Sequence, residues 1–146
     1  MHLTKSVVVG LLATAVAWAK PVLHLDFERD PTGFEVVGDV TFELGPRLPE
    51  YPHFAKDNRA GIFDGSGRLV IKDSGKGSPL DFDNGDAITL EAWVSSGMIG
   101  EGDNVYLIGK GRTNNKGFAA NNQNYALRLR GQGGEGCVSF LFFSRP

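Results

Sequence analysis

The chain has 146 residues, of which 41% are hydrophobic and 22% are charged. This composition is typical of a globular protein and excludes an intrinsically disordered chain. A formal net charge of −2 predicts no general affinity for nucleic acid, and the single cysteine, Cys137, excludes an internal disulfide framework.

The first nineteen residues have the features of an export signal. Lys5 precedes an apolar run over 7–16, and Ala17 and Ala19 are small residues at the positions that signal peptidases recognise. The apolar run is too short for a bilayer span, which needs about 20 residues. We expect cleavage after Ala19 and export to the periplasm, the cell surface or the medium, with no membrane span in the mature domain, 20–146.

Charge is distributed unevenly along the mature chain. Residues 20–103 hold sixteen acids and eight Lys or Arg, a net of −8, whereas residues 104–146 hold one acid, Glu135, and six Lys or Arg, a net of +5. The two parts are expected to neutralise each other on folding. The alternative is a basic ligand-binding face in the second part.

The first half of the mature chain alternates apolar and polar residues with the period of two that is typical of β-strands. Prolines at 46, 49 and 52 predict a loop over 45–59, and 73–86 is a longer polar loop. A first strand is predicted at 21–28. Residues 34–44 are predicted to form strands around a hairpin turn at Gly38-Asp39. Two short strands are predicted at 60–63 and 68–72, on either side of a tight turn at 64–67.

The second half continues this pattern. Its clearest strand is 87–95, in which Ile88, Leu90, Ala92 and Val94 share one face. Further strands are predicted at 104–109, 124–130 and 137–143. The last is apolar on both faces and is expected to be covered on both sides, with Cys137 inert inside it. No segment after the signal shows a helical period, so the predicted fold is an all-β antiparallel sandwich of the jelly-roll type.

Several segments carry a family resemblance. The strand Leu-His-Leu-Asp-Phe-Glu at 23–28, the turn Gly-Ile-Phe-Asp-Gly-Ser-Gly at 61–67 and the strand Ile-Thr-Leu-Glu-Ala-Trp-Val at 88–94 resemble the laminin-G-like branch of the concanavalin A-like lectin and glucanase superfamily, as found in exported bacterial proteins. Sandwiches of this kind commonly need about 200 residues. We therefore expect 20–146 to be the N-terminal part of an incomplete sandwich, a fragment that relies on the remaining strands or further domains of a longer protein.

Glycoside hydrolases share this superfamily, and they need two carboxyl groups flanking the scissile bond. The strand that resembles theirs offers Glu91 alone. Asp26 and Glu28 share one face of the first predicted strand, where a solvated or ion-paired role is the simpler reading. We predict a protein that is not an enzyme, with a glycoside hydrolase or a ligand-free structural spacer as the alternatives.

The predicted function is non-catalytic binding of a carbohydrate or an extracellular protein. Sugar sites combine aromatic faces with amide and charged groups, and an anionic glycan or a protein carboxylate suits arginine. The candidate ligand-binding residues are Trp93, Tyr106, Asn122, Gln123, Asn124, Arg128 and Arg130.

Calcium is the one cofactor that the resemblance suggests. Gln123 and Asn124 fall where pentraxin-like relatives supply an Asp-Asn pair to this ion. The carboxylate is missing here, and calcium affinity follows the charge of its ligands. Any calcium site at this pair is therefore predicted to be weak.

Overall fold

A computed structural model of the chain describes residues 21–28, 33–112, 116–120 and 122–143. Every regular element in these ranges is a β-strand, which confirms the all-β prediction. Within the same ranges no helix is long and apolar enough to cross a membrane. The predicted export signal, 1–19, lies outside the described residues.

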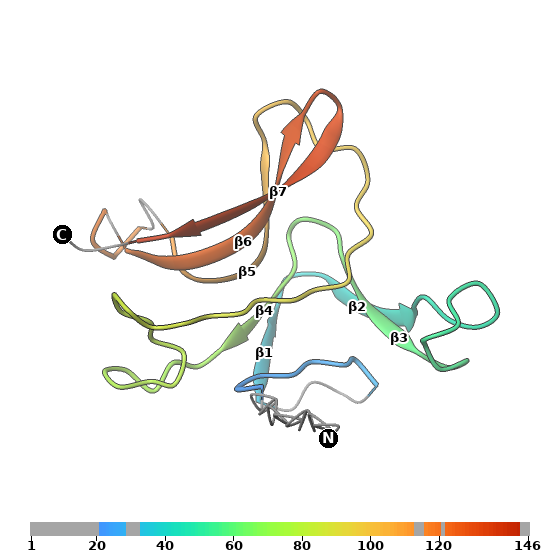
Figure 1. Cartoon of the computed structure of the whole chain (residues 1–146), viewed down its shortest axis with the longest axis horizontal. Coiled ribbons are helices and arrows are strands. Elements are labelled where there is room, and N and C mark those ends of the chain that lie inside the picture. The colour runs from blue at the N-terminus through green and yellow to red at the C-terminus, as the bar shows by residue number, and fades with distance from the viewer. Residues whose placement is uncertain (1–20, 29–32, 113–115, 121, 144–146) are drawn as a thin grey trace, which may run out of the picture.

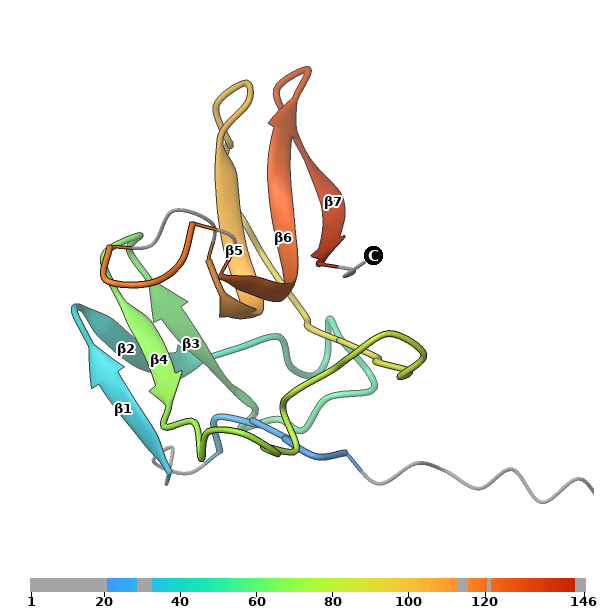
Figure 2. The same cartoon turned by 90° about the vertical axis from the view of Figure 1, so that its left-hand side faces the viewer.

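Seven strands form three small antiparallel sheets (Figures 1 and 2). The strands are β1 (Phe34–Val37), β2 (Val40–Leu44), β3 (Arg59–Phe63), β4 (Arg68–Ile71), β5 (Asn104–Gly111), β6 (Gln123–Gln132) and β7 (Glu135–Phe142). β1 pairs with β4 and β2 pairs with β3, and β5, β6 and β7 form a three-stranded meander with β6 in the centre.

The first four strands make one bent ribbon rather than two hairpins. β1 and β2 follow each other on one chain segment, and β3 and β4 follow each other on a second segment. β1 pairs with β4, and β2 pairs with β3. The predicted hairpin turn at Gly38-Asp39 is therefore wrong, because these residues sit opposite Ser66 and Gly67 at the bend. Gly38 has a φ of 73°, and a Cβ there would lie 2.6 Å from the Ser66 carbonyl oxygen, so the bend requires glycine.

Asp64 fixes the other side of this bend. Its Oδ1 accepts hydrogen bonds from the Ser66 hydroxyl at 2.7 Å, the Ser66 amide at 2.8 Å and the Gly67 amide at 3.2 Å. These bonds favour the carboxylate and hold the pKa of Asp64 below its usual value. The Phe-Asp-Gly-Ser-Gly motif is thus a corner in the ribbon, and the strands on either side of it do not pair with each other.

The three-stranded sheet confirms the predicted strands at 104–109, 124–130 and 137–143. Gly133 and Gly134 close the β6–β7 hairpin with φ values of 62° and 84°. Two successive positive φ values are those of the tight turn that matches the twist of a hairpin, and glycine adopts them without strain. The buried apolar side chains of the described residues are Ile99, Tyr125, Ala126 and Leu129, so the core lies on β6.

One segment, 82–100, crosses the face of β6 and is called the covering segment below. At one end Phe82 is hydrogen-bonded to Asn124, and at the other a Cβ on Gly131 would overlap the Gly100 carbonyl oxygen. Ile99 is buried beside Gly136 at this second end. The segment therefore spans β6 between Asn124 and Gly131 and forms a second, sandwich-like layer over it.

The predicted strand at 87–95 is wrong in this structure: its backbone has no ladder partner among the described residues. The cause is its position. Both ends of the covering segment are anchored on β6, whose backbone groups already pair with β5 and β7. An extended chain that crosses the face of a central strand finds no free edge to pair with.

The predicted strand at 21–28 is also wrong. Phe27 adopts a φ of 60°, which interrupts an extended run. Its ring packs instead against Phe42 at a centroid distance of 5.9 Å and lies beside Gly61. The side chain of Asp26 accepts a hydrogen bond from the Glu28 amide at 3.1 Å, so a local turn replaces the sheet ladder.

β7 is not covered on both sides, contrary to the expectation. Val138, Phe140 and Phe142 share one face and are 76%, 48% and 62% exposed, and Cys137 on the other face is exposed as well. β7 is an edge strand, and the covering segment is anchored on its neighbour β6. The two-faced apolar pattern of β7 thus has no partner on its outer edge in the part of the chain that the structure describes.

Candidate functional site

The strongest cluster of predicted ligand-binding residues lies on the sheet face opposite the covering segment. Tyr106 on β5 pairs directly with Arg128 on β6, which puts both side chains on one face. The guanidinium carbon of Arg128 lies 5.9 Å from the Tyr106 ring centroid, and that of Arg112 lies 5.4 Å from it. Both guanidinium groups are within the range of a cation–π interaction with this ring.

The Arg128 side chain is held in place from two sides. Besides the ring of Tyr106, the Ser139 hydroxyl of β7 accepts a hydrogen bond from Arg128 Nε at 3.2 Å. Tyr106 itself is 40% exposed. The other N–H groups of this guanidinium have no hydrogen-bond partner among the described residues, and they suit a carboxylate or sulfate.

Arg130 extends this surface, because it lies two residues beyond Arg128 on the same face and is exposed. Glu135 also lies on this face, at the hairpin end. Among the described residues no carboxylate approaches these arginines within ion-pair distance, since the ion pairs there all involve Lys110. We call the group of Tyr106, Arg112, Arg128 and Arg130 the arginine face.

Sequence reasoning missed Arg112. This residue follows the end of β5, in an exposed segment without a strand pattern, so periodicity gave no reason to place it beside Tyr106. The available signal was the net charge of +5 in residues 104–146, to which Arg112 contributes. The structure shows that three of these basic side chains gather on or beside one sheet face.

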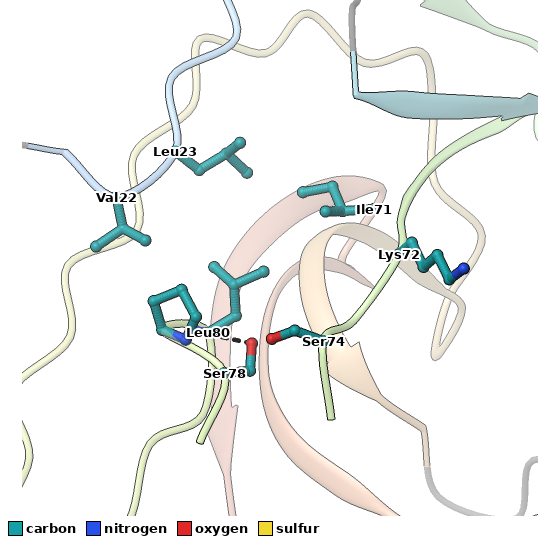
Figure 3. Close-up of a pocket in the computed structure, with 8 residues that line it drawn as sticks. Val22, Leu23, Ile71, Lys72, Ser74, Ser78 and Leu80 are labelled. Atoms are coloured by element: carbon teal, nitrogen blue, oxygen red, sulfur yellow. Dashed lines mark hydrogen bonds between the residues drawn. The ribbon is translucent and has the colours of Figure 1, made fainter. Parts of the chain in front are cut away.

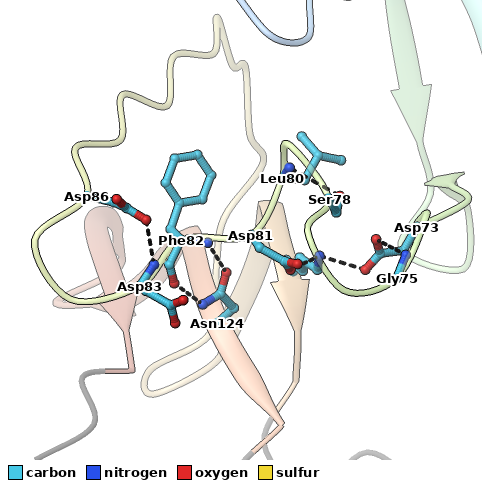
Figure 4. Close-up of polar contacts among 10 residues, drawn as sticks. Asp73, Gly75, Ser78, Leu80, Asp81, Phe82, Asp83, Asp86 and Asn124 are labelled. Atoms are coloured by element: carbon cyan, nitrogen blue, oxygen red, sulfur yellow. Dashed lines mark hydrogen bonds and ion pairs between the residues drawn. The ribbon is translucent and has the colours of Figure 1, made fainter.

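Asn124 has a structural role in this conformation. Its Oδ1 accepts a hydrogen bond from the Phe82 amide at 3.3 Å, and its Nδ2 donates to the Phe82 carbonyl oxygen at 2.8 Å (Figure 4). The side chain thereby replaces a strand partner for Phe82. The ring of Phe82 packs edge-to-face on the ring of Tyr125, with a centroid distance of 5.4 Å, and this contact anchors the covering segment.

Gln123 and Asn122, the other two amides of this loop, lie across from the end of β5, because Gly111 pairs with Gln123. Gln123 is buried, and its Nε2 has no hydrogen-bond partner among the described residues. Asn122 is half-buried, and its backbone amide donates to Ala119. The described residues contain no group of three or more His, Cys, Asp or Glu side chains suited to a metal. Calcium at Gln123 and Asn124 stays a prediction.

Trp93 lies on the covering segment and is 82% exposed. The described residues give it one ring contact, edge-to-face with Phe54 at 5.1 Å. Phe54 belongs to the loop between β2 and β3, so the structure joins Trp93 to the bent ribbon and not to Tyr106. Glu91, the single candidate carboxylate of the hydrolase alternative, is exposed on the same segment.

A separate polar cluster fastens the loop that precedes the covering segment. Lys110 Nζ forms ion pairs with Asp73, at 2.6 Å, and with Asp81 (Figure 4). Burial opposes the charge of Lys110, but the hydrogen bonds to the two aspartates outweigh it and raise the pKa of this amine. The hydrogen bond from Lys110 and a second from the Gly75 amide lower the pKa of Asp73.

These pKa shifts predict that acid releases the loop that precedes the covering segment from Lys110. A carboxyl with a lowered pKa stabilises the fold above its ordinary pKa, near 3.9, and loses that contribution as the pH falls through the lowered value. We expect the Asp73 carboxyl, followed by ¹³C NMR, to titrate below its ordinary value and to return toward it in Lys110→Met. An Asp73 titration that is the same in both proteins contradicts the role assigned to Lys110.

The structure also contains a small apolar pocket between residues 22–23 and the chain that follows β4. Its volume is about 220 Å³, and its apolar lining includes Val22, Leu23, Ile71 and Leu80 (Figure 3). The Ser78 hydroxyl at its base already accepts a hydrogen bond from the Leu80 amide at 3.2 Å. With Lys72 as its one charged lining residue, it offers no arrangement of groups for chemistry.

Comparisons with known proteins identify no relative. No protein-family model matches the chain. No curated protein and no solved structure matches it either.

Proposed function

We propose that the chain is a non-catalytic binding module for an acidic carbohydrate, which binds on the arginine face. The observation that carries this proposal is the pair of guanidinium groups, Arg112 and Arg128, within 6 Å of the exposed Tyr106 ring and without a carboxylate partner among the described residues. The aromatic ring suits the apolar face of a sugar, and the guanidinium groups suit its carboxylate or sulfate.

The sequence supports the wider context of this proposal. The resemblance to laminin-G-like domains suggests a jelly-roll sandwich, of which the described strands would be a part, and the features of residues 1–19 suggest export. An exported sandwich domain meets acidic polysaccharides at a cell surface or in the medium. Of the predicted ligand-binding residues, Tyr106, Arg128 and Arg130 belong to the proposed site.

Calorimetric titration of the full chain with polygalacturonate oligosaccharides and with uncharged dextran oligosaccharides of equal length tests this proposal. We expect binding of the uronate series only, and weaker binding as the salt concentration rises, because salt screens exposed charges over about 10 Å at 0.1 M. Equal affinity for both series, or an affinity for polygalacturonate that salt leaves unchanged, contradicts the proposal.

A further inference from the structure

A second pocket lies on the side of the three-stranded sheet that is opposite the arginine face, between the covering segment and β7. Its volume is about 240 Å³. Drug-sized ligands occupy pockets of about 300–1,000 Å³, so this pocket suits a smaller molecule. The lining residues are Phe82, Asp83, Asp86, Ile88, Asn124, Tyr125, Phe140 and Phe142.

Four aromatic rings form the walls of this pocket. Phe82 and Tyr125 meet edge-to-face, with centroids 5.4 Å apart and an interplanar angle of 83°. Phe140 and Phe142 lie nearly parallel, at 6.3 Å and 23°, and stay 48% and 62% exposed. Phe82 comes from the covering segment, and the other three rings lie on one face of the three-stranded sheet, where Tyr125 pairs directly with Phe142. Aromatic rings attract cations over their faces through their quadrupoles.

Two carboxylates, Asp83 and Asp86, complete the pocket. Asp86 Oδ2 accepts a hydrogen bond from the Asp83 amide at 2.8 Å, which closes the turn at the pocket rim (Figure 4). Among the described residues, no Lys, Arg or His lines the pocket. Lys110, which pairs with Tyr125 across β5 and β6, is engaged by Asp73 and Asp81. The charge of Asp83 and Asp86 thus stays uncompensated by any described basic residue.

We propose that this pocket binds a small organic cation with an apolar surface, of the alkylammonium class. Charge complementarity selects the sign of the ligand, because two aspartates line the pocket and no described basic residue does. The aromatic walls favour a methylated ammonium over a metal ion. Aromatic rings displace water from a methylated ammonium at little cost, but they cannot replace the hydration shell of a metal ion. The site is separate from the arginine face, which attracts the opposite charge on the other side of the sheet.

Binding of choline and of its uncharged isostere 3,3-dimethylbutan-1-ol to the full chain, followed by NMR titration, tests this proposal. The two probes have the same shape and differ in charge. We expect choline to bind about tenfold more tightly than the alcohol, the size of effect that cation–π and carboxylate contacts give at a partly desolvated site. Equal affinity for the two probes, or competition by a neutral monosaccharide at the concentration of choline, overturns the proposal.

Two substitutions locate the cation. Asp83→Asn removes a charge from a side chain that forms no hydrogen bond or ion pair with another described residue, and Phe140→Leu removes one ring but keeps an apolar side chain. Each substitution is expected to weaken choline binding severalfold. Asp83→Asn is expected to leave the affinity for the alcohol unchanged. Arg128→Gln serves as the control, with choline affinity unchanged and polygalacturonate affinity reduced. If Asp83→Asn leaves the preference for choline over the alcohol intact, the proposal is wrong, whatever happens at the arginine face.

Discussion

Replacing Arg128 with Gln is expected to weaken binding of polygalacturonate oligosaccharides about tenfold. A charge-assisted hydrogen bond contributes about 1.5–3 kcal/mol, and about 1.4 kcal/mol corresponds to a factor of ten in affinity. Arg128 is the central cation of the arginine face, because it contacts Tyr106 and Ser139 and lies beside Arg130 on the same face. Titration calorimetry of the variant and the parent chain measures the effect.

Two further variants separate charge from shape. Arg128→Lys keeps the charge but loses the planar group that stacks on Tyr106, and we expect an affinity between those of the parent and Arg128→Gln. Lys76→Gln makes the same charge change at an exposed residue of the 73–86 loop, away from the arginine face, and is expected to bind like the parent. If Lys76→Gln lowers the affinity as much as Arg128→Gln, net charge and not the arginine face governs binding.

The second large effect is expected from Asn124→Leu, which removes the clamp on Phe82. The variant leaves the Phe82 amide and carbonyl groups without their partner at a partly buried position. An unsatisfied buried polar group costs about 1–3 kcal/mol, so we expect the free energy of unfolding to fall by about 2 kcal/mol. For a domain of this size the melting temperature then drops by about 8 °C, measured by circular dichroism.

Asn122→Leu is the matched control for this variant. It makes the same substitution two residues earlier, at a half-buried side chain without a hydrogen bond to another described residue. We expect its melting temperature to stay within about 2 °C of the parent, as for most substitutions away from a specific contact. Equal losses in the two variants contradict the clamp and would point to a general effect of leucine in this loop.

The sequence predicted strands well where a neighbouring strand was available. β6 alternates apolar and polar residues, β7 is an apolar run, and the three strands of this sheet pair in chain order, so the sequence pattern was sufficient to find them. The same pattern at 87–95 forms no strand, because the chain is anchored on the face of β6 by Asn124 and Gly131 and meets no free edge. Periodicity reports which side chains share a face, but ladder pairing depends on contacts distant in sequence.

Like the strands, the candidate site could be predicted from the sequence only in part. Tyr106 and Arg128 were both predicted as ligand-binding residues, and the structure places them opposite each other on paired strands. Arg112 reaches the same ring from beyond the end of β5, and Asn124 is engaged by Phe82, 42 residues earlier. Both relations depend on tertiary structure, which explains why Arg112 was missed and why Asn124 was assigned to a ligand.

The most direct test of the arginine face is an NMR titration of the full chain with a uronate oligosaccharide, in which the arginine Nε–Hε signals are observed. The account predicts that the signals of Arg112 and Arg128 shift and saturate with one common dissociation constant, because both groups flank the same Tyr106 ring. Saturable shifts confined to residues outside the arginine face, with the Arg112 and Arg128 signals unchanged, would contradict it.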